Sequence, residues 1–429
     1  MTIVITTHGS TGDIYPLIRL ALALQEAGHT IRFATSRPFK PDVEEAGVPF
    51  FQIPPDWEKS ELQYWMGRLQ KLKSPVSQLK EMYRAATPHM EAILDAMEEA
   101  IDGADCLISS YLFPINKAIA QKHDIPFISY AFAHNTVPSR FYPPHEFPRL
   151  RGMPDWLQLR WNRLCWKIGN VIVDTAINTT ISRAFKRKGL PGVKDFFSKS
   201  AELVLVAVSP GLMRPKIKLH PRFQFTGYCR WQYPKSQETE QKLLAFRGGE
   251  LVPIITFGSM VYDKPEEVIQ RLLQAWPKDK KLILQTGWSG FKVPDSATHI
   301  LELGPMSHDQ LLQHASVVIH HGGAGTTASV LYAGKPHIVV PHIGDQDFFS
   351  AEVKRLGCGI KLGKRNWPEK LASKVQLVES EPSFLEAARA ALQTLEQEDG
   401  PGEAVHQIEA YLEHRRHLIG DFLGLDEDF

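Results

Sequence analysis

The feature that most constrains the fold is a strand–turn–helix–strand pattern that occurs twice, far apart in the chain. Residues 2–7 (TIVITT) are mostly β-branched, and a glycine-containing turn leads from them into PLIRLALALQEAGH, whose apolar spacing and final Gly28 predict a helix. TIRFAT at 30–35 predicts the next strand. SVVIHHGG, GTTASVLYAG and HIVVPH repeat the pattern downstream. Such units form parallel sheets covered by helices, so the sequence predicts an α/β fold.

The chain length indicates more than one such sheet. At 429 residues, one hydrophobic core is too small for the whole chain, and two domains are expected. The polar, Pro- and Gly-containing stretch 231–249 is typical of a linker. We therefore predict two doubly wound domains facing each other across a cleft, at 1–230 and 250–401, with residues 402–429 as a final helix and tail.

Composition excludes several classes of protein. The formal net charge of +1 argues against nucleic acid as the main partner. The four cysteines are widely spaced and form no CxxC pair, which fits a reducing compartment. No run of about 18 apolar residues occurs, and the first residues lack the pattern of a signal peptide. A cytoplasmic chain is therefore the expectation.

Two stretches, 54–100 and 135–200, interrupt the α/β pattern. The second is rich in aromatic residues, which either build a binding cleft or pack the insert against its own domain. RWNRLCWK (160–167) and RAFKRKG (183–189) interleave cations with aromatic and apolar residues. They could touch a membrane surface or form a solvated helix face over buried tryptophans, and the sequence leaves both open.

HHGGAGTT at 320–327 has the chemistry of an anion site. The glycines let the backbone turn tightly, and the two threonines are predicted to open a helix whose free amides and dipole favour a phosphate group. A histidine beside it could neutralise charge on a departing phosphate. The candidate residues are His321, Gly323, Gly325, Thr326 and Thr327.

The motifs GSTGDIYPLIRLALALQEAGH and HHGGAGTTASVLYAGKPHIVVPHIGDQDFF resemble those of family 1 GT-B nucleotide-sugar glycosyltransferases. The resemblance is strongest to the branch of sterol glucosyltransferases and bacterial antibiotic glycosyltransferases, and it extends over essentially the whole chain. It implies that His321, Gly325 and Thr326 contact the donor phosphates, that Asp345 and Gln346 hold the sugar hydroxyls, and that Ser259 lies near the phosphates. GPMSHDQLL, with Met306, would supply the nucleobase pocket.

Two departures from the family pattern concern the donor. Ser329 stands where plant members carry a ribose-binding glutamate, and the nucleobase loop has Met306 and His308 in place of a Trp-rich form. UDP-glucose is the expected co-substrate, with TDP-sugars as the alternative. DQD at 345–347 resembles a metal-binding DxD motif, but the helix start already supplies positive potential, so no metal cofactor is expected.

The first turn, THGSTGDIYP, is predicted to carry the base. The resemblance places an aspartate three residues before a proline in this role, as Asp13 stands before Pro16. An acceptor hydroxyl needs a positioned proton acceptor, and a closed cleft would desolvate the carboxylate. Asp13 could also cap a helix beginning near Pro16. His8 is the second candidate base, and Ser10, Thr11 and Gly12 are candidates to bind phosphate or acceptor.

The resemblance therefore implies an inverting transfer of a hexose from a UDP-sugar to a hydroxyl of a lipophilic acceptor of sterol, triterpenoid, polyketide or flavonoid type. Two alternatives stay open from the sequence. One is a nucleotide-sugar epimerase or hydrolase on the same fold, and the other is a nucleotide-sugar-binding protein without turnover.

Overall fold

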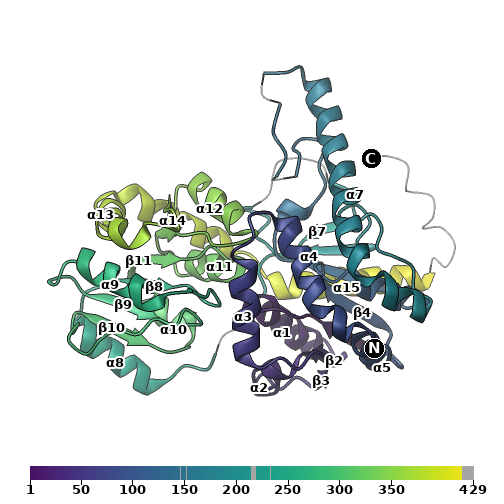
Figure 1. Ribbon diagram of the computed structural model, residues 1–429, viewed down its shortest axis with the longest axis horizontal. Coiled ribbons are helices and arrows are strands. Elements are labelled where there is room, and N and C mark those ends of the chain that lie inside the picture. Colours follow the sequence, from purple (N-terminus) through teal and green to yellow (C-terminus); the bar gives the residue numbers. More distant parts are fainter. Residues whose placement is uncertain (145, 151, 214–218, 232, 418–429) are drawn as a thin grey trace.

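The protein contains two parallel sheets, each covered by helices, as the sequence predicted (Figure 1). The computed structural model describes residues 1–144, 146–150, 152–213, 219–231 and 233–417. The predicted tail beyond residue 417 lies outside the described residues. We call the part built on the first sheet the first lobe and the part built on the second sheet the second lobe.

The first sheet has seven strands in the order β3-β2-β1-β4-β5-β6-β7, all paired in parallel. Chain order reverses beside β1, which is the position where open α/β sheets bind ligands. The strands are β1 (Thr2–Thr6), β2 (Thr30–Thr35), β3 (Phe50–Gln52), β4 (Cys106–Ser110), β5 (Phe127–Ala131), β6 (Leu203–Val206) and β7 (Phe223–Phe225).

The second sheet has six parallel strands in the order β10-β9-β8-β11-β12-β13 and reverses beside β8. Its central strands are wholly buried, since helices cover both faces. The strands are β8 (Val252–Thr256), β9 (Leu282–Gln285), β10 (Ile300–Leu303), β11 (Ala315–His320), β12 (His337–Val339) and β13 (Gly359–Lys361).

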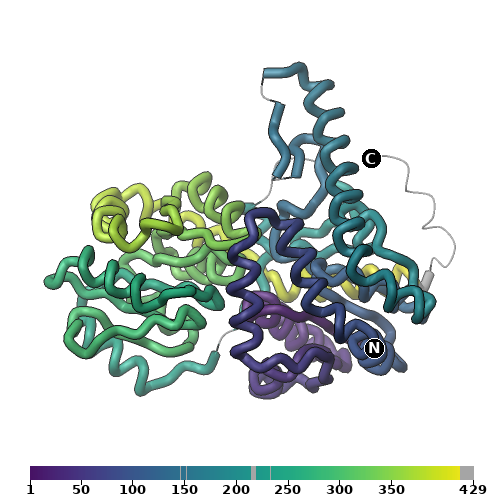
Figure 2. The backbone as a smooth tube through the Cα atoms, in the orientation of Figure 1, coloured from purple at the N-terminus to yellow at the C-terminus, as the bar shows by residue number. Residues whose placement is uncertain are grey.

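Helices connect the strands in both lobes (Figure 2). Those of the first lobe are α1 (Thr11–Glu26), α2 (Lys40–Glu45), α3 (Lys59–Leu69), α4 (Pro75–Ala86), α5 (Met90–Ala100), α6 (Ile115–Lys122) and α7 (Asp155–Lys188), with 3₁₀ turns at Arg37–Phe39, Thr87–His89 and His134–Thr136. Those that follow are α8 (Gln237–Arg247), α9 (Pro265–Ala275), α10 (His308–Leu312), α11 (Ala324–Tyr332), α12 (Gln346–Arg355), α13 (Trp367–Ser380), α14 (Pro382–Leu395) and α15 (Gly400–His417). Among the described residues, no helix is long and apolar enough to cross a lipid bilayer.

The final helix packs on the first lobe. Ala404, Ile408 and Leu412 of α15 are buried in the core that α1 and β1 form. Glu409 Oε1 also lies 3.0 Å from His29 Nε2, in the turn that follows α1. The described chain therefore begins and ends in the first lobe, so two segments connect the second lobe to it.

Two helices begin earlier than predicted. Helix α1 starts at Thr11, not near Pro16, so Pro16 lies inside the helix. Helix α11 starts at Ala324, two residues before Thr326. In both, the N-cap residue, Ser10 or Gly323, adopts an extended backbone that ends the turn. The glycine-rich turns are therefore shorter than the sequence pattern indicated.

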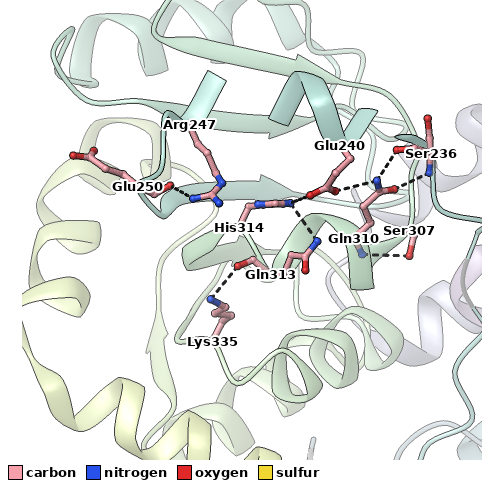
Figure 3. A network of polar contacts seen from close by, with 9 residues as sticks. All are labelled: Ser236, Glu240, Arg247, Glu250, Ser307, Gln310, Gln313, His314 and Lys335. Atoms are coloured by element: carbon pink, nitrogen blue, oxygen red, sulfur yellow. Dashed lines mark hydrogen bonds and ion pairs between the residues drawn. The ribbon is translucent and has the colours of Figure 1, made fainter. Parts of the chain in front are cut away.

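Much of the predicted linker is helical and packs on the second lobe. Helix α8 buries Leu243 in the core beside β8. The backbone N–H of Ser236 donates to Gln310 Oε1 at 3.0 Å, and Glu240 accepts from Gln310 and pairs with His314 (Figure 3). Ser307 caps α10 by accepting from the Gln310 backbone N–H, and the Gln310 side-chain amide donates to the Ser236 carbonyl of this linker.

The aromatic residues of the second insert divide between core and surface. Trp166, Phe185 and Phe196 are buried, whereas Trp156 is 59% exposed. The first half of α7 projects away from the body of the molecule (Figure 1). The alternative in which these aromatics pack their own domain therefore holds for Trp166 and Phe185, whereas the buried Phe196 also lines a cavity.

Candidate active site

A single large cavity of about 790 Å³ collects the turns that follow the strands of both sheets. Its wall includes residues after β1, β4 and β5 of the first lobe and after β8, β9, β11 and β12 of the second. This volume lies in the usual range for small-molecule sites. The site therefore lies between the lobes, where the predicted cleft was expected.

Twelve of the fourteen residues predicted from the sequence line this cavity. They are Ser10, Thr11, Gly12, Asp13, Ser259, Met306, His321, Gly323, Gly325, Thr326, Asp345 and Gln346. The other two, His8 and Thr327, are not among its lining residues. Thr327 is fully buried behind the first turn of α11, so its hydroxyl is not positioned to meet a ligand there.

Asp13 is the third residue of α1 and forms a capping box with Ser10. Its Oδ2 accepts from the Ser10 backbone N–H at 2.8 Å and from the Ser10 hydroxyl at 3.0 Å. Burial raises the pKa of Asp13 and outweighs these two hydrogen bonds, which lower it. The side chain is thus a base candidate and a helix cap at once, as the sequence allowed.

Gly9 makes room for this carboxylate. Its φ of +129° is in the region that glycine tolerates best, and a Cβ there would lie 2.4 Å from Asp13 Oδ2. A side chain at position 9 would therefore displace Asp13.

His8 lies next to the site but packs into the protein. Its ring contacts Phe113 edge-on, with centroids 5.4 Å apart, and burial lowers its pKa to about 4. A neutral imidazole can accept a proton, but His8 is half-buried and is not among the residues that line the cavity. This placement favours Asp13 over His8 as the base.

The amino end of α11 opens onto the cavity. Gly323 is the N-cap, and the amides of the next three residues have no partner within the helix. The His321 ring lies against this turn, because a Cβ on Gly323 would be 2.5 Å from His321 Nε2 and one on Gly258 would be 3.1 Å from Cε1. The two glycines therefore hold an imidazole at the positive end of a helix.

Burial and, to a smaller extent, the nearby His308 lower the pKa of His321 to about 4. These two effects favour the neutral imidazole. A bound dianion would reverse the balance, because a negative charge within a few ångströms favours the protonated ring.

The adjacent His320 has a structural role. Its Nδ1 accepts from the Gly322 backbone N–H at 3.1 Å, and its Nε2 is 2.9 Å from Nδ1 of His337. Both histidines are fully buried between β11 and β12. The pair fixes the backbone from which His321 projects.

Asp345 and Gln346 lie at the start of α12, on the cavity wall. Gln346 Oε1 accepts from the backbone N–H groups of His342 and Ile343 at 2.7 and 3.1 Å, and its Nε2 donates to Met260 Sδ at 3.3 Å. Its amide is therefore already engaged, and only the weak Met260 contact is easily exchanged for a ligand. Asp345 makes no capping hydrogen bond with its side chain.

Asp345 is electrostatically coupled to Asp13. Burial and then the charge of Asp13 raise the pKa of Asp345 to about 7. Two carboxylates from opposite lobes thus line one cavity, and burial and mutual repulsion favour the protonated form of Asp345.

The second aspartate of the DQD motif is turned to another partner. Asp347 forms an ion pair with Lys361 on β13. Within the described ranges, no group of three or more His, Cys, Asp or Glu residues has the arrangement of a metal site.

Residues missed by the sequence reasoning form much of the remaining wall. Gln285 is the last residue of β9, and Trp288 lies in the turn after it. The end of the strand and Gly287, whose φ is +54°, are the sequence features that could have indicated a ligand-facing turn here. Helices α3 and α4 contribute an apolar surface to the cavity wall. The sequence pattern of this segment did not indicate which of its side chains face a cavity. Their lining residues are Leu62, Met66, Leu69, Val76, Leu79 and Met82.

The α3–α4 hairpin also reaches the second lobe directly. Gln70 Oε1 accepts from the Val261 backbone N–H at 2.9 Å, and Gln70 Nε2 donates to the Val261 carbonyl at 3.0 Å. Lys71 pairs with Asp263 at 3.0 Å on the surface. The hairpin is therefore joined to the loop that carries Ser259 and Met260.

Two family models match the chain, one in each lobe. Residues 3–137 match the glycosyltransferase family 28 N-terminal domain, and residues 290–411 match the erythromycin biosynthesis protein CIII-like C-terminal domain. The matched ranges contain the Asp13 turn and the His321 turn, respectively.

Relatives and solved structures agree with these models. The chain is 28% identical to a sterol 3-beta-glucosyltransferase of Pichia angusta over 96% of its own length, but it spans only 34% of that relative. The calicheamicin glycosyltransferase CalG4 has a TM-score of 0.67 at 19% identity, covering 96% of this chain and 98% of that one. The Streptomyces sp. SF2575 glycosyltransferase SsfS6, complexed with thymidine diphosphate, has a TM-score of 0.64 at 17% identity, covering 96% and 99%. Both lobes and the cavity between them thus have the arrangement of the GT-B fold that these glycosyltransferases share.

Proposed function

We propose that this chain transfers a hexose, glucose being the favoured sugar, from a nucleoside-diphosphate sugar to a hydroxyl of a lipophilic, sterol-like acceptor. The observation that carries the proposal is the meeting of two groups in one cavity. Asp13 comes from the first lobe, and the amino end of α11 comes from the second. A proton acceptor and an anion site facing one space match the two demands of glycosyl transfer.

The second lobe supplies the donor side. The free amides at the start of α11 and His321 would bind the diphosphate, and Ser259, 7% exposed, lies on the same wall. Asp345 and Gln346 would bind the sugar hydroxyls. The name of the Pichia angusta relative favours glucose, while the thymidine diphosphate bound to SsfS6 keeps a TDP-sugar as the alternative donor.

The first lobe supplies the acceptor side. The hairpin of α3 and α4 presents aliphatic and methionine side chains, and Phe196 and Phe197 add aromatic surface. Such a wall binds an apolar body by removing both surfaces from water. Together with the name of the relative, this favours a sterol-type alcohol over a polar sugar acceptor.

The reaction would proceed with inversion. The acceptor hydroxyl oxygen attacks the anomeric carbon while Asp13 takes the hydroxyl proton. The bond from that carbon to the phosphate oxygen breaks, and its electron pair leaves with the nucleoside diphosphate. Burial raises the pKa of Asp13, which makes the carboxylate a stronger base than an exposed aspartate. Negative charge that develops on the leaving oxygen is stabilised by the helix start and His321.

The test is an acceptor screen with UDP-glucose and TDP-glucose, read by mass spectrometry and by release of nucleoside diphosphate. The proposal expects release that depends on a sterol-type alcohol and a product heavier by one hexose. Release without acceptor would indicate a hydrolase, and an epimerised donor would indicate an isomerase. Donor binding without turnover of any acceptor in the screen would indicate a nucleotide-sugar-binding protein that is not an enzyme.

A further inference from the structure

Exposed apolar side chains gather on one projection of the molecule. Of the eleven large hydrophobic residues that the described structure leaves exposed, seven lie between 141 and 172. We call residues 139–172, comprising the segment before α7 and its first half, the α7 projection. It extends away from both lobes (Figure 1). Clustering of this kind marks an interaction surface, since scattered single residues would need no explanation.

The first half of α7 exposes several large apolar residues on its outer face. Leu164 and Val171 are 48% and 65% exposed, whereas Trp166 and Asn170 on the inner face are 4% and 5% exposed. The same turns also expose Trp156 and Ile168. A helix whose outer face meets only water carries mostly polar residues there. The outer face therefore has the composition of a surface that meets an apolar medium.

The projection is held in shape by its buried polar groups. Asn162 Nδ2 donates to the Arg140 carbonyl at 3.0 Å, Trp161 Nε1 to the Pro148 carbonyl at 2.8 Å and Trp166 Nε1 to the Tyr142 carbonyl at 2.9 Å. These bonds fasten the segment before α7 along the helix. These hydrogen bonds therefore fix the backbone that carries the exposed apolar side chains.

The same projection is strongly basic. Residues 139–172 contain six arginines or lysines against two acids, in a chain whose formal net charge is +1. Arg163 and Lys167 are exposed next to Leu164 and Ile168. The Arg140 guanidinium lies 5.1 Å from the Phe141 ring centroid, and that of Arg160 lies 5.4 Å from a Trp156 ring centroid. Cations beside exposed apolar and aromatic groups complement the anionic head groups of a lipid surface.

The projection leads into the cavity. Ile172 is 42% exposed and also lines the cavity wall, together with the buried Gly169 and Val173 on the adjoining turns. One helix therefore runs from the apolar outer face to the acceptor side of the site.

We propose that the α7 projection docks on an anionic lipid surface, placing the apolar side of the cavity against the membrane so that a lipophilic acceptor enters from the lipid. The entry of the acceptor rests on the proposed function. The docking itself does not, because it depends only on the apolar and basic residues of the projection.

Vesicle flotation tests the docking without any turnover. The protein would be mixed with phosphatidylcholine vesicles, with or without phosphatidylserine, at low and high salt. We expect flotation that needs phosphatidylserine and weakens with salt. Leu164→Glu with Val171→Glu, and separately Arg163→Glu with Lys167→Glu, should each reduce binding at least about tenfold, since each basic residue near such a surface contributes about 1 kcal/mol.

Matched controls lie outside the projection. Leu244→Glu with Leu377→Glu introduces the same charges at positions that are 45% and 40% exposed on the second lobe, and it should float like the wild type. All variants should keep their melting temperature and their turnover of a detergent-dispersed acceptor. Equal flotation of projection and control variants would overturn the proposal. So would a change from dimer to monomer in the projection variants without any change in flotation, which would assign the face to a second copy of the chain.

Discussion

Asp13 of the first lobe and Asp345 of the second both line the cavity between the lobes, and burial together with the charge of Asp13 raises the pKa of Asp345 to about 7. Asp13 lies in the first turn of α1, after β1, and Asp345 is the N-cap of α12, after β12. The empty site therefore holds two acids that repel each other when both are ionised. A sugar between them would contact both, which suits a hexose hydroxyl at one carboxylate and an acceptor hydroxyl at the other.

Replacing Asp13 by Asn should abolish most of the transfer while leaving the donor site intact. The amide oxygen can still accept from Ser10, so the cap of α1 is kept. Loss of a general base costs about 10²–10⁴-fold in kcat. Steady-state kinetics, with calorimetry of UDP binding as the control, check this. A kcat within a few-fold of the wild type would exclude Asp13 as the base.

The pH dependence of stability should reveal Asp345. Its pKa in the folded protein lies above the unfolded value of about 3.9, so the folded state binds more protons between roughly pH 4 and 7. The contribution of Asp345 to the free energy of unfolding is therefore fully present below about pH 4 and is lost as the pH rises through about 7. Asp345→Asn should stabilise the empty protein at pH 8, on the order of 1 kcal/mol, and much less at pH 5. Thermal melts of both proteins at the two pH values measure the difference, and a gain independent of pH would contradict it.

Donor binding should take up a proton at His321. Its pKa of about 4 in the empty protein would rise beside a diphosphate. Calorimetry of UDP binding at pH 6.5 in buffers of different ionisation enthalpy should therefore show net proton uptake.

His321→Ala should remove that uptake and weaken UDP binding by about 10–100-fold, as expected for a charge-assisted hydrogen bond. His123, the C-cap residue of α6, is 42% exposed and offers a matched His→Ala control that should leave both quantities unchanged. Proton uptake that persists in His321→Ala would assign it to another group.

Gln70→Ala should raise the KM for the donor with a smaller effect on kcat. Its amide is the two-bond link between the α3–α4 hairpin and Val261, next to Ser259. Loss of two hydrogen bonds costs about 1–3 kcal/mol. Part of this cost lowers the free energy of unfolding, and the rest weakens donor binding. Lys71→Ala is the control, because the Lys71–Asp263 pair is more than 60% exposed on both sides and contributes little. Equal effects of the two substitutions would show that the hairpin link does not support the donor loop.

Local sequence patterns determined the units of this fold. β-branched runs followed by glycine turns and apolar helices predicted both parallel sheets, and the positions of Asp13 and His321 at strand ends placed them on the cavity. These predictions succeed because a strand, its turn and the following helix are set by neighbouring residues. The errors at the starts of α1 and α11 were a few residues long, since caps depend on which hydrogen bonds the folded turn can complete.

Tertiary structure alone decided what these units do together. The Gln70–Val261 link joins residues 191 positions apart, the Gln310 side chain binds Ser236 of the predicted linker, and several apolar residues of α7 are left exposed. The pKa of Asp345 is raised by burial and, in addition, by the charge of Asp13 from the other lobe. Burial and long-range contacts create each of these properties, because a side chain's charge state and partners depend on which distant residues exclude water around it.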